Sequence, residues 1–168
     1  HKDFRAASVK AIYKLSKGHN GLEEALEKMV SKVESKVDSG HNIIIISDRN
    51  VNQKFAPIPI LIACSYIHHS MIKLNKRSKF GIVIESAEPR EPHHFSMLFG
   101  YGASAINPYL VNEIIAYKCE VGVLENLENA INNYNNAIAK GILKVMNKIG
   151  ISTLHSYRGS QIFEALGL

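Results

Sequence analysis

The stretch that decides the fold is FGIVIESAEPREPHHFSMLFGYGASAINPYL, residues 80–110. Its first five residues are mostly apolar, as in a strand buried in a parallel sheet. A cluster of charged residues follows, and a helix predicted over 92–99 is closed by Gly100-Tyr101-Gly102. A short strand predicted over 103–106 then leads into Asn-Pro-Tyr. The stretch therefore predicts a strand–helix–strand unit with polar side chains gathered where its strands end.

The same alternation extends on both sides of this stretch. The spacing of apolar residues predicts helices over 22–37, from about 56 to 74, over 111–118 and over 127–148, the last ended by Gly150. Four isoleucines at 43–46 are typical of a strand buried on both faces. Residues 151–154 are predicted as a short strand, and a final helix is predicted from Ser156 to 166. The second helix is predicted to bury one stripe: Ile60, Cys64, Ile67, Met71 and Leu74.

Strands alternating with helices predict an α/β fold with a parallel sheet. About four strands are visible, fewer than a complete eight-stranded barrel needs. The first 21 residues follow no clear pattern and stay unassigned. At 168 residues, the chain is long enough for one domain with a sizeable core.

Composition narrows the function classes. The net charge is +5, which raises the question of nucleic-acid binding. The basic residues are scattered, apart from a group at Lys73, Lys76, Arg77 and Lys79 that has no interleaved aromatic residues. We interpret that group as a solvated turn. No apolar run approaches the ~20 residues of a membrane-spanning helix.

The two cysteines, Cys64 and Cys119, lie far apart in apolar segments and lack metal-ligand spacing. They are predicted to be buried free thiols in a reducing compartment. No signal peptide is visible, and a start at His1 rather than Met predicts an excised or trimmed segment.

Polar residues at the strand ends are the candidates for chemistry, because parallel sheets bind ligands beyond the carboxyl ends of their strands. They are Asp48, Arg49, Glu85, Glu88, Arg90, Glu91 and Asn107. One interpretation pairs a carboxylate with His93 or His94 as acid and base. The other is an ion-pair and capping network in which Glu91 suits a helix start and Arg90 neutralises a neighbour. The network is favoured, since nothing supplies a nucleophile.

Three further motifs carry weaker signals. His68-His69 and His93-His94 are adjacent pairs about 100° apart on a helix, so neither pair is expected to chelate zinc. One histidine of each pair is predicted to face inward. Gly100-Tyr101-Gly102 is too short for a dinucleotide fingerprint. The turn at 146–153 either cradles an anion with backbone N–H groups or is a plain connection.

Five motifs resemble one family in the same order along the chain. They are IIIISDR (43–49), APIPILIA (56–63), VIESAEPREPHHF (83–95), GYGASAINPYL (100–110) and KGILKVMNKIGISTLHSYRGSQIFEALGL (140–168). From about residue 22 onward, the chain resembles the large (alpha) subunit of glutamate synthase. It departs from that family's usual pattern at Ser104, Pro92 and Asn147, where Asp, Val and Ser are common.

The resemblance implies a multidomain parent enzyme that converts glutamine, 2-oxoglutarate and reductant into two glutamates. Its other parts would be an amidotransferase-type glutaminase domain, a (β/α)8 domain carrying FMN and a 3Fe-4S cluster, and a C-terminal β-helix. Residues 22–124 would belong to the central domain, which resembles a (β/α) barrel in topology and is incomplete here. Residues 125–168 would form a long connecting helix and the start of the FMN-binding domain.

The resemblance also implies what this segment does. It would be a scaffold between the glutaminase and synthase sites that contributes to the ammonia channel, and it would be inactive and cofactor-free alone. Lys148, Gly150, Ser152 and Thr153 would lie near the FMN domain or the tunnel. Partners would be the remaining domains and an electron donor, which is NADH, NADPH or ferredoxin. The expected location is the cytoplasm, or a plastid or other organelle if the parent carries a transit peptide.

Two alternatives from the residues stay open beside this interpretation. One is a free-standing α/β module that binds an anionic small molecule at the strand ends and the turn at 150–153. The other is a hydrolase or lyase that uses Glu85 or Glu88 with His93 or His94. Neither alternative involves nucleic acid or a membrane.

Overall fold

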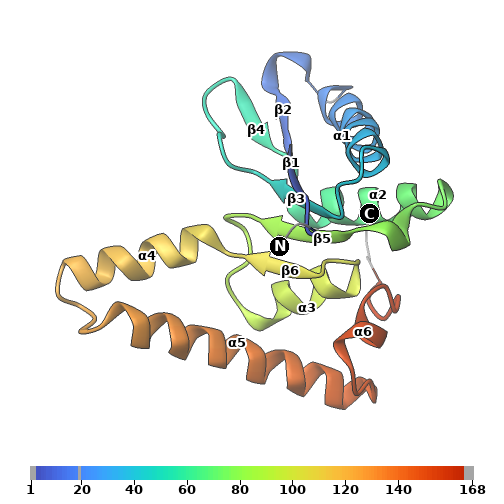
Figure 1. Ribbon diagram of the computed structural model, residues 1–168. Helices are drawn as coiled ribbons and strands as arrows, with labels where there is room; N and C mark the ends of the chain where they lie inside the picture. Colours follow the sequence, from blue (N-terminus) through green and yellow to red (C-terminus); the bar gives the residue numbers. More distant parts are fainter. Residues whose placement is uncertain (1–2, 19, 165–168) are drawn as a thin grey trace.

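A four-stranded parallel sheet forms the centre of the computed structural model, which describes residues 3–18 and 20–164 (Figure 1). The strands lie in the order β1 (Ala6–Lys10), β3 (Ile43–Ser47), β5 (Gly81–Glu85) and β6 (Ala105–Asn107). Every neighbouring pair is parallel. The predicted α/β class with a parallel sheet is therefore confirmed.

The unassigned start of the chain supplies two strands. β1 pairs with β3 along five residues, and β2 (Ile12–Lys14) pairs antiparallel with β4 (Phe55–Pro57). Between β2 and the first long helix lies the 3-10 turn η1 (Leu15–Lys17). β1 is an edge strand in which Val9 alone is fully buried, so its sequence lacks the continuous apolar run that marks β3.

Three helices cover one face of the sheet: α1 (Asn20–Asp38), α2 (Ile60–Lys73) and α3 (Pro92–Gly100). Their buried side chains join one core with those of the strands, including Val33, Cys64, Leu98, Ile44 and Ile82. Helices confined to one face are the arrangement of a barrel segment, whereas a doubly wound sheet has helices on both faces. This arrangement agrees with the (β/α) topology that the resemblance implies.

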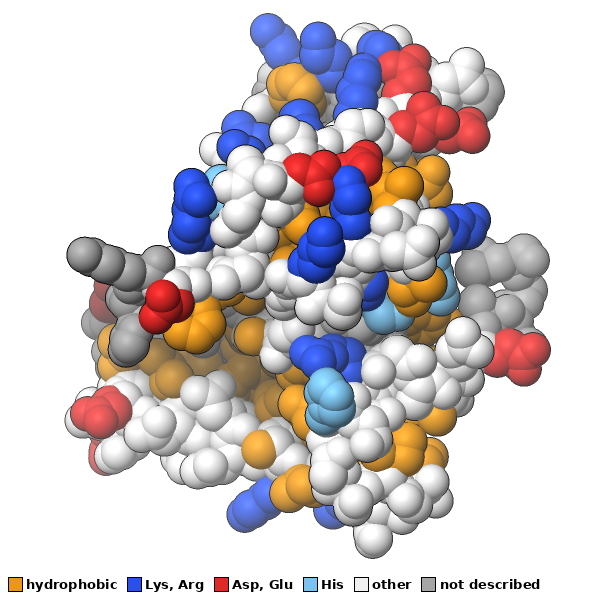
Figure 2. Space-filling model, turned by 45° about the vertical axis from the view of Figure 1, so that its right-hand side comes forward, with side chains coloured by type: hydrophobic (Ala, Val, Ile, Leu, Met, Phe, Trp, Pro, Cys, Tyr) orange, Lys and Arg blue, Asp and Glu red, His pale blue; other side chains and the backbone are white. Residues whose placement is uncertain are grey.

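The opposite face is only partly covered, so the prediction that 43–46 is buried on both faces was wrong. Ile44 and Ile46 are fully buried, but Ile43 and Ile45 are half-buried. Side chains alternate across a strand, and only the even-numbered ones meet the helices. Figure 2 shows hydrophobic side chains at the floor of a hollow on the left of that view.

The second helix begins later than predicted. Pro57 lies in β4, paired with Ile12, and Pro59 is the residue before α2. The Ile58 amide donates to the Ala11 carbonyl, which keeps the chain extended up to the helix start. At the other end α2 stops at Lys73, so Leu74 lies outside the buried stripe and is exposed.

Beyond the sheet, α4 (Tyr109–Glu120) and α5 (Leu127–Ile149) form a helical hairpin, as Figure 1 shows. α5 returns along α3, where the Tyr134 hydroxyl donates to the Arg90 carbonyl over 3.1 Å. Gly141 allows this close approach, because a Cβ added there would lie 2.4 Å from the Pro92 side chain. Gly150 ends α5 in the left-handed conformation, as predicted.

The predicted strand at 151–154 and the helix from Ser156 were both wrong. Residues 151–153 have no regular structure, and the short helix α6 (Leu154–Tyr157) ends where a long one was expected. Residues 158–164 are irregular, and the rest of the predicted helix lies outside the described residues. The reason is tertiary: the fully buried Tyr157 donates to the Ser96 carbonyl, and the Gly159 amide donates to the Gly100 carbonyl.

The two cysteines differ in environment. Cys64 is completely buried, and burial raises the pKa of its thiol to about 12. Cys119 is only half-buried on α4, so the prediction of two buried thiols was wrong for that residue. Among the described residues no helix is long and apolar enough to span a bilayer.

Candidate functional site

Three strand ends meet at one edge of the sheet. Ser47, Glu85 and Asn107 stand opposite one another in the last register of β3, β5 and β6. Asp48 and Ser86 follow directly. Parallel pairing alone explains this convergence, because the carboxyl ends of parallel strands lie at the same edge.

Glu85 is held from two directions. Its carboxylate accepts hydrogen bonds from the Ser47 hydroxyl at 2.6 Å and from Arg49 Nε at 3.1 Å. Arg49 also donates to Glu113 Oε1 at 3.2 Å, and its guanidinium lies 3.9 Å from the centre of the Tyr109 ring. The hydrogen bond to Glu85, followed by that to Glu113, raises the pKa of Arg49. Through its contacts with Glu85, Glu113 and Tyr109, Arg49 links the ends of β3 and β5 to the start of α4.

Asp48 is the buried charge of this edge, with only 2% of its surface exposed. Its Oδ2 accepts from the Ser86 hydroxyl at 2.5 Å and from the Ala87 amide at 3.1 Å. Its Oδ1 is buried and accepts no regular hydrogen bond from the described residues. Burial and the adjoining Asp48 side chain raise the pKa of Tyr109 to about 12. The Tyr109 hydroxyl therefore stays protonated beside Asp48.

Glu88 closes the network by binding the start of α2. Its Oε1 accepts from the Ile60 amide at 3.0 Å, and its own amide donates to the Ser86 hydroxyl. Glu88 is exposed as a residue, but the desolvation of its carboxyl by the surrounding chain raises the pKa of that group. We call Ser47, Asp48, Arg49, Glu85, Ser86 and Glu88 the strand-end network. Nearly every polar group in it is engaged by another part of the chain.

A cavity of about 410 Å³ adjoins this network between α2 and α3. Its walls are mainly apolar, with Glu88, Arg90 and His94 as the polar lining. The Arg90 amide donates to His94 Nδ1 at 3.2 Å, which orients that imidazole. No Ser or Cys lines the cavity among the described residues, so the carboxylate and histidine there lack the nucleophile that a covalent mechanism needs.

The remaining candidates at this edge make other contacts. The cation that pairs with Glu85 is Arg49. Glu91 precedes α3 without a capping hydrogen bond from its side chain, and its carboxylate lies 3.6 Å from His94. Asn107 Oδ1 accepts from Asn112 at 3.4 Å. Ser47, Ser86 and Tyr109 were visible as strand-end residues, whereas Glu113 lies on the next helix and nothing in the sequence indicated its contact with Arg49.

Lys148, Gly150, Ser152 and Thr153 do not join this edge. They lie at the far end of α5, beside the opposite end of the sheet (Figure 1). All four are exposed. Thr153 Oγ1 accepts from the Ser156 amide and so caps α6, which has only four residues. Between the two interpretations of this turn, the structure favours the plain connection.

The histidine pairs behave as expected for structural residues. On α2, His68 is half-buried and His69 is exposed, and on α3 His94 is half-buried and His93 is exposed. His68 Nδ1 accepts from Arg77 Nε at 3.0 Å, while Arg77 donates to the carbonyls of Phe80 and Gly102. The described part of the chain contains no group of three metal-ligating side chains.

His68 makes folding sensitive to acid. Burial and the charge of Arg77 lower its pKa from 6.5 to about 4, so the folded chain holds it neutral. Above pH 6.5 His68 is neutral in both the folded and the unfolded chain, so it does not reduce the free energy of unfolding. As the pH falls from about 6.5 towards 4, only the unfolded chain takes up the proton, and the free energy of unfolding falls. Discounted for its partial exposure, the loss is about 1–2 kcal/mol. His68→Gln should flatten this part of the pH profile of urea unfolding, with the exposed His93→Gln as control. Equal slopes in both variants would contradict the assignment.

Comparison with known proteins identifies the family. The family model described as glutamate synthase central domain matches residues 1–168. The chain belongs to the glutamate synthase central-domain family. It is 40% identical over 169 residues to the glutamate synthase [NADPH] large chain of Bacillus subtilis, and 42% identical over 173 residues to glutamate synthase [NADH] of Schizosaccharomyces pombe; both matches cover the whole chain. It is 37% identical to ferredoxin-dependent glutamate synthase 2 of Synechocystis, with 98% of the chain covered.

The relatives are far longer than this glutamate synthase central-domain chain. The matched region is 11% of the Bacillus subtilis protein, 8% of the Schizosaccharomyces pombe protein and 11% of the Synechocystis protein. The match with the central domain runs to residue 168, and an FMN-binding domain beginning at 125 stays a prediction. The division of the chain at residues 21 and 124 likewise stays a prediction.

Proposed function

We propose that this chain is a scaffold segment of a longer glutamate synthase polypeptide that carries out no chemistry itself. The observation that supports the proposal is the engagement of the strand-end network. Glu85 is occupied by Ser47 and Arg49, Asp48 by Ser86 and Ala87, and Glu88 by the start of α2. Carboxylates committed to internal donors hold the chain in place and are poorly suited to accept a substrate proton.

Cofactor chemistry is proposed to lie in other domains of that polypeptide. Iron–sulfur clusters are held by several Cys thiolates. The sequence has two cysteines, and burial raises the pKa of Cys64 so that its thiolate is disfavoured. The residues present therefore do not fit a 3Fe-4S cluster. Flavin contacts, the glutaminase cysteine and the electron-donor site are likewise proposed to lie outside this segment.

We further propose that the segment contributes to the passage of ammonia between the glutaminase and synthase sites. The support is the turn at Lys148, Gly150, Ser152 and Thr153, whose four residues are all exposed. The measurable consequence is coupling, that is, glutamine hydrolysed per glutamate formed. A Thr153→Trp change that leaves this ratio unaltered in the long polypeptide would count against a position beside the ammonia route.

Glu85→Gln tests the scaffold proposal in the long polypeptide. The substitution weakens the charge-assisted bond to Arg49, so we expect about 1–2 kcal/mol loss of stability. Synthase turnover per folded enzyme should stay within about twofold, since an interaction that makes no transition-state contact does not change kcat. Glu23→Gln, an exposed carboxylate on α1, is the matched control.

The outcomes separate the hypotheses. Loss of activity by more than about a hundredfold with unchanged stability would identify Glu85 as an acid–base group, as the hydrolase or lyase alternative requires. Reduced stability with retained turnover would support the scaffold. Circular dichroism in urea and initial rates on the same preparations give the two quantities.

A further inference from the structure

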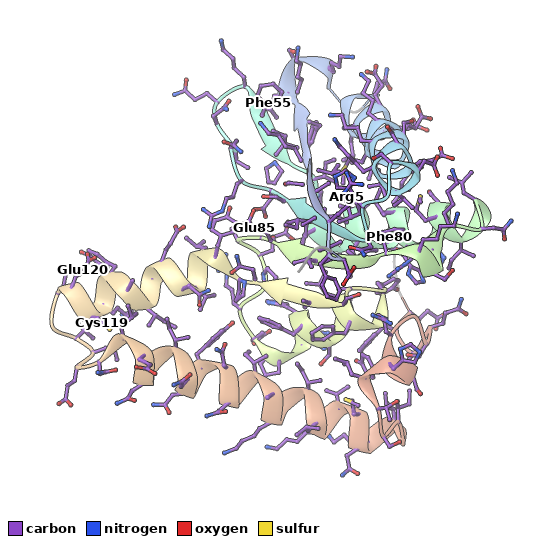
Figure 3. All side chains as sticks on the ribbon, viewed as in Figure 1. Arg5, Phe55, Phe80, Glu85, Cys119 and Glu120 are labelled. Atoms are coloured by element: carbon purple, nitrogen blue, oxygen red, sulfur yellow. The ribbon has the colours of Figure 1, made fainter. Side chains whose placement is uncertain are left out.

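The helical hairpin formed by α4 and the start of α5 projects from the body of the molecule. We call residues 109–128 the arm. α4 continues in the direction of β6, away from the sheet, before α5 turns back towards α3 (Figure 1). Figure 3 places Glu85 near the base of the arm and Cys119 and Glu120 near its far end. The base is fixed by the contacts of Arg49 with Glu113 and Tyr109.

α4 carries two apolar stripes, of which one is partly buried and the other is exposed. No residue of α4 is buried. Val111, Ile115 and Cys119 are partly buried, whereas a second stripe stays open to solvent. Its members and their exposed fractions are Ile114 46%, Tyr117 62% and Val121 51%, with Val123 63% and Leu127 43% beside them at the tip. Ile114, Tyr117 and Val121 recur at steps of three and four, so they form one face of the helix.

Large apolar side chains at this spacing are the pattern of a helix face packed against a partner. Scattered exposed apolar residues need no explanation, but here five are concentrated within fourteen residues of one short arm. The arm also carries four glutamates and one lysine, whereas the whole chain is +5. Glu113 pairs with Arg49, so Glu120, Glu125 and Glu128 with Lys118 leave a net charge of −2 to face a partner. A complementary partner surface is therefore apolar at its centre and basic at its rim.

We propose that the arm docks on an apolar, basic-rimmed surface of another domain of the same long polypeptide. This inference rests on the proposed function, in which the chain is one segment of a glutamate synthase. The length of the relatives favours another domain as the partner of the arm. The matched region is 8–11% of their length, so most of such a polypeptide lies outside this chain. A second copy of this chain is the competing occupant, and the experiment tells the two apart.

Hydrogen exchange of peptides covering 114–127 tests the arm in the long polypeptide. Tyr117→Asp removes an apolar contact and adds a charge, and we expect exchange there to become at least about tenfold faster. Leu143→Asp, on a 61% exposed leucine of α5, is the matched control and should leave arm exchange unchanged. In the 168-residue chain alone the arm should already exchange fast, and Tyr117→Asp should change little.

Three other results would contradict, in turn, the docking of the arm, the identity of its partner and the proposed function. Equal arm exchange in the long polypeptide and the 168-residue chain would show that nothing covers the arm. Protection that rises with concentration in the 168-residue chain, together with a dimer in sedimentation, would assign the arm to a second copy. A gene product no longer than this chain would overturn the proposed function itself, which the mass of the intact protein shows independently of exchange.

Discussion

Gly102→Ala should destabilise the chain by about 2–4 kcal/mol in urea unfolding followed by circular dichroism. Gly102 has φ +107°, a conformation that side-chain-bearing residues rarely adopt, and an added Cβ would lie 2.2 Å from His68 Nδ1. His68 cannot simply swing away, because Arg77 binds the same ring nitrogen and also donates to the Gly102 carbonyl. Both backbone strain and side-chain overlap therefore oppose the substitution.

Gly122→Ala is the control that separates these two effects. Gly122 also has a positive φ, +74°, but no atom lies within 4 Å of an added Cβ. It should cost about 1 kcal/mol from backbone strain alone. Equal losses for the two alanine variants would show that the contact between Gly102 and His68 is not tight.

Asp48→Ala should cost about 2–4 kcal/mol, the second large effect. The Ser86 hydroxyl and the Ala87 amide would lose their acceptor in a place that water does not reach. A buried donor left without a partner costs its full desolvation energy. The same unfolding measurement gives the value, with stability compared at pH 7.

Asp38→Ala provides the matched comparison for Asp48→Ala. Asp38 pairs with Lys76 at 2.8 Å, but its side chain is 51% exposed. An exposed ion pair of this kind contributes about 0–1 kcal/mol. A loss for Asp48→Ala no greater than that for Asp38→Ala would remove Asp48 from the strand-end network as a stabilising group.

Local sequence patterns predicted the elements whose burial follows a simple period. β3, β5, α1, α3 and α5 were predicted within a few residues because their apolar residues repeat at the spacing of a strand or helix. β1 was not predicted, because an edge strand with one buried side chain has no such pattern. The segment after Gly150 was mispredicted because the burial of Tyr157 against α3, far away in the sequence, overrides local preference.

The candidate site was predictable in its location and unpredictable in its pairings. Parallel strands place their carboxyl ends together, so Asp48, Glu85 and Asn107 could be expected at one edge. Which cation pairs with which carboxylate depends on side-chain direction across the sheet. The pairing of Arg49 with Glu85 was not predicted, and Glu113 pairs with Arg49 from the helix that follows the site.

The burial of Tyr157 also bears on how the chain is made. Ser96, which accepts the Tyr157 hydrogen bond, leaves the ribosome 61 residues before its partner. At roughly 5–20 residues per second, that interval is on the order of 3–12 s. α5 emerges within this interval, and Tyr157 emerges at its end, so the outer side of α3 first lacks both and then lacks the Tyr157 ring. The nascent segment is therefore most open to chaperones and to wrong associations just before its last 40 or so residues emerge.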